Sequence, residues 1–128
     1  MFVVTNRIPV AEGMESEFED RFRNRAHLID AFPGFIRNQV LRPIKRRLNH
    51  ETGRIEDSAE QGYYLVQTCW KDEKSFWDWT QSEAFRIAHS NRPPAGMFAG
   101  SSMLEVHEVV LSTERRQEPG QGHSESGA

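Results

Sequence analysis

The order of strand-like and helix-like segments restricts the fold of this chain more than any other feature. Residues 2–10, 35–42, 63–70 and 103–112 carry β-branched and aromatic side chains, which are typical of strands. One helix-like segment lies between the first two of these stretches, and another lies between the last two. The chain therefore contains two consecutive β-α-β units.

Both helix-like segments have helical spacing and recognisable ends. In the second, Asp72 and Ser82 are the expected N-caps of two successive helices. The first is expected to stop at Pro33 and Gly34, after one apolar stripe spaced mostly every four residues: Met14, Phe18, Phe22, Ala26 and Ile29. The β-α-β-β-α-β order predicts an α+β fold of the ferredoxin-like type, in which an antiparallel sheet carries the helices on one face.

The other face of such a sheet would still carry apolar side chains. A sheet of this size rarely leaves that face open to water, because large apolar patches favour association. We therefore expect two copies of the chain to pack sheet against sheet as a homodimer.

Composition excludes several classes of function. The chain has 128 residues, enough for one domain, and 16 Lys plus Arg against 19 Asp plus Glu give a formal charge of −3. Without a basic surplus, nucleic acid and anionic membranes are not expected as partners. Cys69 is the single cysteine, which suits a reducing compartment. We expect a cytoplasmic protein, because the apolar run at the N-terminus is too short for a signal peptide.

Two segments are too polar to join a core. Residues 45–61 are charged and polar, with only Leu48 and Ile55 as apolar exceptions, and are expected to form a long loop between two strands. Residues 114–128 contain no large apolar side chain and are expected to be a disordered tail. The domain is therefore expected to span residues 1–113.

A few side chains depart from the pattern of their segments. Asn6 lies on an otherwise apolar strand face, where it either bonds to the backbone or points into a pocket. Phe76 and Trp79 share a helix face. His89 follows one turn after Phe85 and either packs there or ligates a metal or haem. Zinc, nucleotide and hydrolase motifs are absent from the sequence.

Four stretches resemble the antibiotic biosynthesis monooxygenase (ABM) superfamily, and within it the small haem-degrading monooxygenases of staphylococci and mycobacteria. They are VTN, RFRNRAHLIDAFPGF, QVLRPIK and FWDWTQSEAFRIAHS. The last is the most specific, because it places Trp79 and His89 ten residues apart within W-T-x-S-x-A-F-x-x-A-H-S. Residues 45–61 are not part of the family pattern and could cover the haem entrance, contact a partner subunit or bind an electron donor.

The resemblance implies a haem site. His89 would be the proximal axial ligand of the haem iron, and Trp79 would press against the porphyrin. Asn6 would donate a hydrogen bond to the distal ligand. Phe22 and Phe76 match pocket-lining positions, and Arg25 either meets a haem propionate or is only a solvated helix charge. His27 is expected among the helix charges, which would leave His89 as the only histidine in the pocket.

The resemblance also implies an activity. Haem would be both cofactor and substrate, and O2 with electrons from a reductase or small reductant would open its ring, releasing iron and a linear tetrapyrrole. The expected assembly is a dimeric α+β barrel. Two alternatives stay open: a cofactor-free ABM oxygenase acting on a quinol or aromatic substrate, and a haem carrier or sensor without turnover. The Asn6, Trp79 and His89 trio favours haem, since a cofactor-free oxygenase needs no axial ligand.

Overall fold

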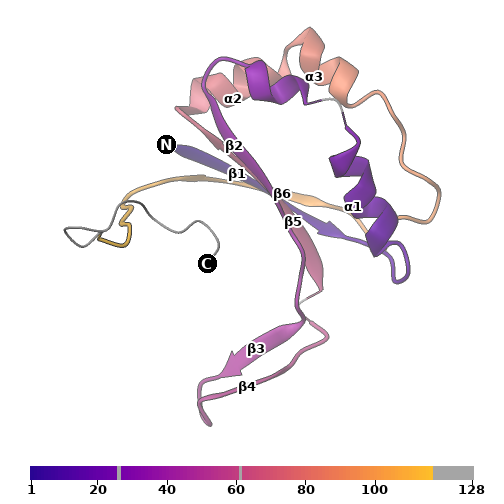
Figure 1. Ribbon diagram of the computed structural model, residues 1–128, viewed down its shortest axis with the longest axis vertical. Coiled ribbons are helices and arrows are strands. Elements are labelled where there is room, and N and C mark those ends of the chain that lie inside the picture. Colours follow the sequence, from indigo (N-terminus) through magenta and orange to yellow (C-terminus); the bar gives the residue numbers. More distant parts are fainter. Residues whose placement is uncertain (26, 61, 117–128) are drawn as a thin grey trace.

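A four-stranded antiparallel sheet with helices on one face forms the body of the molecule (Figure 1). The computed structural model describes residues 1–25, 27–60 and 62–116. The sheet order is β2-β5-β1-β6, and every neighbouring pair is antiparallel. Its strands are β1 (Phe2–Pro9), β2 (Phe35–Leu41), β5 (Tyr63–Trp70) and β6 (Met103–Glu108). The predicted α+β fold with an antiparallel sheet is confirmed.

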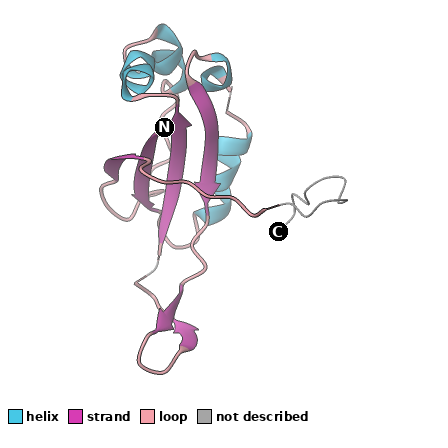
Figure 2. Cartoon of the chain, turned by 90° about the vertical axis from the view of Figure 1, so that its left-hand side faces the viewer, coloured by secondary structure: helices cyan, strands magenta, loops and turns pink. Residues whose placement is uncertain are grey.

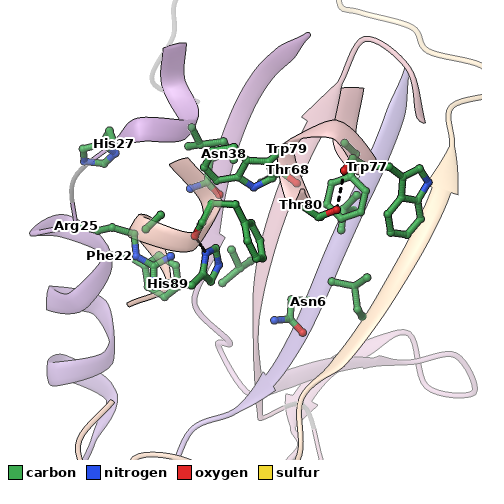
Figure 3. Close-up of a pocket in the computed structure, with 17 residues that line it drawn as sticks. Asn6, Phe22, Arg25, His27, Asn38, Thr68, Trp77, Trp79, Thr80 and His89 are labelled. Carbon is green, nitrogen blue, oxygen red and sulfur yellow. Dashed lines mark hydrogen bonds between the residues drawn. The ribbon is translucent and has the colours of Figure 1, made fainter. Parts of the chain in front are cut away.

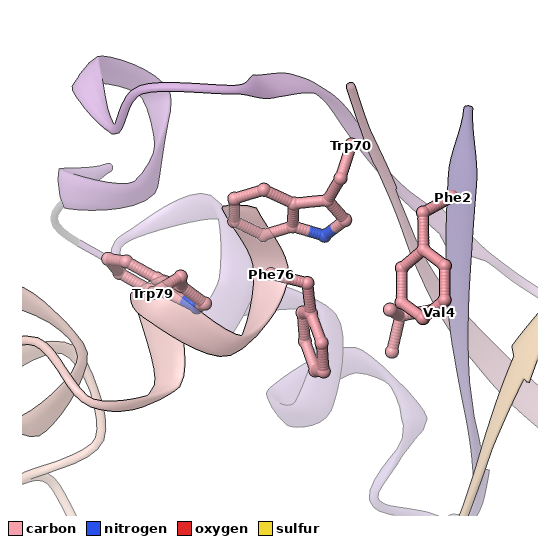
Figure 4. Close-up of a cluster of buried hydrophobic side chains, with 5 residues drawn as sticks. All are labelled: Phe2, Val4, Trp70, Phe76 and Trp79. Atoms are coloured by element: carbon pink, nitrogen blue, oxygen red, sulfur yellow. The ribbon is translucent and has the colours of Figure 1, made fainter. Parts of the chain in front are cut away.

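Two apolar clusters attach the helices to the sheet. The first joins β1 and β5 to α2 (Glu73–Thr80), as Figure 4 shows, and consists of Phe2, Val4, Trp70, Phe76 and Trp79. The second joins β1 and β5 to α1 (Glu15–Arg23) and consists of Ile8, Phe18, Tyr64 and Met97. The predicted caps are confirmed: Asp72 accepts from the Ser75 amide before α2, and Ser82 accepts from the Phe85 amide before α3 (Glu83–Ala88).

The prediction of one continuous first helix is wrong. The α-helix α1 ends at Arg23, and a short 3-10 helix η1 follows at Leu28–Ala31. The break lets this segment contribute side chains to both clusters. Phe18 packs beside Tyr64, whereas Ile29 packs on the cluster around Trp70. Four-residue spacing shows which side chains are buried together on a helix, but it does not show that they belong to two clusters. Ala26 of the expected stripe lies outside the described residues.

The turn before β2 requires glycine. Gly34 has a φ of 87°, a conformation that residues with a Cβ rarely adopt. A Cβ at this position would also lie 2.1 Å from Ser75 Oγ on α2. The turn therefore brings β2 against the N-terminus of α2, where a larger residue would not fit.

The prediction of a long loop at 45–61 is also wrong. Two strands, β3 (Arg46–Asn49) and β4 (Arg54–Asp57), form a hairpin that projects away from the main sheet, as Figures 1 and 2 show. The Asn49 carboxamide oxygen accepts from the Glu51 and Thr52 amides and closes the turn. Leu48 and Ile55 pair across the strands and are 47% and 64% exposed. The polar composition of residues 45–61 did not indicate strands, because a two-stranded hairpin outside the core needs few apolar side chains.

The sheet face away from the helices is mixed in character. It carries apolar Val3, Leu41, Leu65 and Met103, but polar side chains such as Thr5 alternate with them. The last strand ends at Glu108, shorter than expected. Residues 117–128, most of the expected tail, lie outside the described residues. Over the described residues, no helix has both the length and the apolar character needed to cross a membrane.

Candidate active site

A cavity of about 370 Å³ lies between the helix-bearing face of the sheet and the helices (Figure 3). Pockets for small organic ligands commonly measure about 300–1,000 Å³. All six predicted site residues line this cavity: Asn6, Phe22, Arg25, Phe76, Trp79 and His89. They come from β1, from α1 and the turn after it, from α2 and from the end of α3. The structure therefore brings together side chains that are spread over more than half of the sequence.

His89 forms the C-cap of α3, and its ring is held from one side. Nδ1 lies 2.8 Å from the Phe85 carbonyl oxygen, and the two rings stack with 4.0 Å between centroids. A carbonyl oxygen only accepts hydrogen bonds, so Nδ1 carries the hydrogen and donates it. Nε2 then keeps its lone pair, and it bonds to no residue in the described part of the chain. A neutral imidazole with its other nitrogen held in this way is a suitable metal ligand.

Asn6 lies on the sheet floor between buried Val4 and Ile8. Its neighbours across the strands are Val66 and Leu104, both apolar. The Asn6 carboxamide makes no hydrogen bond with any described residue, so it does not bond to the backbone. The structure thus favours the second of the two interpretations of this residue, an amide directed into the cavity.

The two tryptophans of α2 have different environments. Trp79 is 4% exposed and packs against Trp70, Phe32 and Phe85, so its indole belongs to the core as well as to the cavity wall. Trp77 is 44% exposed, and its Nε1 donates to Glu73 at 2.8 Å. The structure therefore places Trp79 inside and Trp77 at the surface, although Trp77 also borders the cavity.

Arg25 lies just beyond the end of α1 rather than on a helix. Its guanidinium carbon lies 4.4 Å from the centre of the Phe22 ring. Burial, with a smaller contribution from the nearby Arg21 charge, lowers the pKa of Arg25. Arg25 forms no ion pair with the described carboxylates. Arg25 is thus a partly buried cation that lines the cavity, which favours the propionate alternative over a solvated helix charge.

Four further polar residues line the cavity and were not predicted from the sequence: His27, Asn38, Thr68 and Thr80. His27 lines the same cavity, so the expectation that His89 is its only histidine is wrong. Asn38 and Thr68 face it from paired positions of β2 and β5. Thr68 Oγ1 accepts from Trp70 Nε1 at 2.9 Å, whereas Asn38 makes no hydrogen bond with a described residue. His27 could have been found because it lies two residues after Arg25, which was predicted to line the pocket. No spacing rule in the sequence pointed to Asn38.

A charged network centred on Glu19 holds α1 in place. Tyr64 donates to Glu19 Oε2 at 2.5 Å, and Arg42 donates to the same carboxylate from Nε at 2.6 Å. These hydrogen bonds, that of Arg42 first, lower the pKa of Glu19 from 4.5 to about 2. Burial and the Glu19 contact raise the pKa of Tyr64 to about 12. The network ties α1 to β5 and to Arg42, the residue that follows β2, one turn before Phe22, so it positions that wall of the cavity.

Comparison with known proteins decides the family. The family model described as antibiotic biosynthesis monooxygenase matches residues 1–91. This chain belongs to the ABM family. The resemblance inferred from sequence motifs is therefore confirmed, and the ABM core covers the sheet up to β5 together with all six predicted site residues.

Two relatives narrow the position of this ABM protein within the family. The mycobilin-producing haem oxygenase of Mycobacterium tuberculosis is 35% identical over 109 residues, covering 85% of this chain and 89% of the relative. The staphylobilin-producing haem oxygenase of Staphylococcus haemolyticus is 36% identical over 113 residues, covering 88% of this chain and 94% of the relative.

Solved structures agree with these relatives. The haem degrader MhuD of Mycobacterium tuberculosis, with two haems bound in its active site, matches with a TM-score of 0.67 and 29% identity. The match covers 89% of this chain and all of that one. SnoaB, a cofactor-independent oxygenase from Streptomyces nogalater, matches with a TM-score of 0.58 at 17% identity, which indicates a shared fold alone.

Proposed function

We propose that this ABM protein is a haem-degrading monooxygenase. It binds haem and uses O2 and external electrons to open the porphyrin ring, releasing iron and a linear tetrapyrrole. The observation that carries the proposal is His89, whose Nδ1 is occupied by the Phe85 carbonyl while Nε2 is left as a ligand at an apolar cavity. The proposal is supported by the 35% and 36% sequence identity to the haem oxygenases of Mycobacterium tuberculosis and Staphylococcus haemolyticus.

The residues around the cavity fit haem, which is flat, mostly apolar and anionic at one edge. Phe22, Phe76 and Trp79 supply aromatic walls, and Arg25 supplies a partly buried cation for a propionate. The described residues hold no cluster of three or more His, Cys, Asp or Glu suited to a bare metal ion. One imidazole at a mostly apolar cavity is instead the donor set of a haem site.

Four side chains of the cavity have a proposed task. Haem, when bound, supplies the redox-active iron and is itself the molecule that is cleaved. His89 Nε2 holds it from the side of α3, with ring orientation set by the Phe85 carbonyl. Asn6 lines the site from the sheet and would donate a hydrogen bond to the group bound there. Trp79 and Phe76 exclude water and fix the position of the ring system.

We also propose a homodimer formed through the sheet face away from the helices, where Val3, Leu41, Leu65 and Met103 lie. A charged side chain there would oppose association, so Leu65→Asp is expected to yield monomer in analytical ultracentrifugation. Ile87→Asp is the control, because Ile87 is 48% exposed on α3, on the other side of the sheet. A cytoplasmic setting is proposed as well, because Cys69 is a free, buried thiol and the reaction requires a cellular reductant.

Haemin titration followed by reduction in air tests the function. A saturable Soret shift at about one haem per chain, which decays with release of chelatable iron once reductant is added, is the expected result. A stable Soret band in the presence of reductant and O2 would instead favour a carrier or sensor. Failure to bind haem would favour a cofactor-free oxygenase, the activity of SnoaB.

A further inference from the structure

We propose that Asn38 is a second amide on the sheet side of the haem site and helps to determine which edge of the ring is opened. The inference rests on the proposed function, and it concerns a residue outside the Asn6, Trp79 and His89 trio. Asn38 would hydrogen-bond the small ligand held on the haem face that looks toward the sheet. In that role it is a specificity-determining residue.

A β-bulge directs Asn38 into the cavity. Phe35 pairs with Trp70, but Arg37 pairs with Cys69, so one extra residue is inserted into β2 between them. With regular alternation, Arg37 and Gln39 would share the face of Phe35. The bulge instead places Asn38 opposite Thr68 on the helix-bearing face. Bulges recur beside active sites, where the local shift in alternation changes the face to which side chains point.

Asn38 and Asn6 lie on opposite sides of β5. Asn38 aligns with Thr68 and Asn6 with Val66, so they are separated by two strand spacings and two residues along the strands. With strands about 4.8 Å apart and about 3.4 Å per residue, their Cα atoms lie roughly 12 Å apart. A ligand located between these strands therefore has an amide on each side. Figure 3 shows both amides on the sheet, with His89 arriving from α3.

The surroundings leave the Asn38 amide available. The floor between the two amides consists of apolar Val4 and Val66 together with Thr68, whose hydroxyl oxygen already accepts from Trp70. Asn38 also borders the hollow beside Glu19 and Arg42, yet those two groups satisfy each other. Asn38 is exposed, lines the cavity and is bonded to none of its described neighbours, so a ligand in the cavity could replace water at its amide.

Two donors on either side of one ligand give a directional preference. A single hydrogen bond of ordinary strength favours one orientation over the other by about threefold to tenfold. Asn6 alone would direct the ligand toward β1, whereas Asn38 adds an opposing preference toward β2. The ratio of tetrapyrrole isomers would then depend on both amides.

The test compares Asn38→Leu with Gln39→Leu, because Gln39 is the next residue on the same strand and faces the other side of the sheet. Haemin titration comes first: normal binding in all three proteins is expected. Absence of binding in the wild-type protein would overturn the proposed function, and this inference with it. Asn38→Ala serves in the same comparison if Asn38→Leu fails to fold.

Cyanide binding to the ferric haem complex provides a readout that does not depend on turnover. Cyanide occupies the haem face opposite the histidine and accepts hydrogen bonds, so Asn38→Leu is expected to weaken its binding about threefold or more, with no change in Gln39→Leu. Mass spectrometry of the products is expected to show an altered isomer ratio in Asn38→Leu alone. Unchanged cyanide affinity and isomer ratio, with haem binding intact, would overturn the inference.

Discussion

His89 donates from Nδ1 to the Phe85 carbonyl oxygen at 2.8 Å while its imidazole stacks on the Phe85 ring. The two residues are one helical turn apart, so the contact is fixed within α3 and does not depend on a distant element. The hydrogen bond selects the tautomer, and the stacking limits rotation of the ring. Together they hold Nε2 in place before any ligand arrives.

His89→Ala is therefore expected to remove axial ligation of ferric haem while leaving the cavity walls intact. Free imidazole should restore the Soret maximum, since it can occupy the volume that the side chain vacates. His27→Ala is the matched control, because His27 lines the same cavity and should not ligate the iron. Loss of the ligated spectrum in His27→Ala, but not in His89→Ala, would reverse the assignment.

Asn6→Ala is expected to bind haem normally and to lose ring opening. The carboxamide has no described hydrogen-bond partner, so its removal leaves no unsatisfied group in the protein. Loss of one donor aimed at a reacting group commonly lowers the rate about 100-fold or more. Single-turnover decay of the Soret band measures this, with Thr5→Val as the control on the opposite face of β1. A wild-type rate in Asn6→Ala would make the amide purely structural.

Residues on regular elements could be predicted from the sequence. Strand alternation places Asn6 on the apolar face of β1, and helical spacing places Phe76 and Trp79 together in the core. Cap chemistry locates the starts of α2 and α3 at Asp72 and Ser82. These predictions succeed because each depends only on contacts between residues near in sequence.

Features that depend on irregular backbone could not be predicted. The bulge at residues 35–37 reverses the alternation of β2, which conceals Asn38, and the break after Arg23 separates Arg25 from the helix. Both deviations are decided by packing between distant elements: β2 against Trp70 and η1 against Trp79. A sequence pattern indicates which secondary structure a segment prefers locally. It does not show the tertiary contacts that override this preference.

Trp79 and Trp77 should differ sharply in their effect on stability. Trp79→Ala is expected to lower the free energy of unfolding by about 3–5 kcal/mol, because it empties a site packed by Trp70, Phe32 and Phe85. Trp77→Ala is expected to cost about 1 kcal/mol or less, since that side chain is 44% exposed. Urea unfolding measures both. Equal losses would contradict the core role of Trp79.

Acid should weaken the fold through Glu19. Its pKa is about 2 in the folded chain and 4.5 ordinarily, so below pH 4.5 the unfolded chain binds a proton that the folded chain does not. Stability from this group is complete above pH 4.5 and is lost as the pH falls through about 2. Glu19→Gln is expected to flatten the dependence of unfolding on pH across that window, whereas Glu17→Gln should not. Identical profiles for the two variants would contradict the role of the network.

The β3–β4 hairpin should be dispensable for haem binding by this chain. Its strand residues, Arg46–Asn49 and Arg54–Asp57, do not line the cavity that contains His89. Ser58 donates its amide to the Lys45 carbonyl at 2.8 Å, so the two ends of the hairpin already lie side by side. Replacing residues 46–57 with Asn-Gly, a two-residue hairpin turn, should close the gap without strain. Haemin affinity is expected to change by about twofold or less, as for a change remote from the site. A larger loss would mean that the hairpin contributes to a haem site, either its own or that of a second copy, and sedimentation of the shortened protein would distinguish the two.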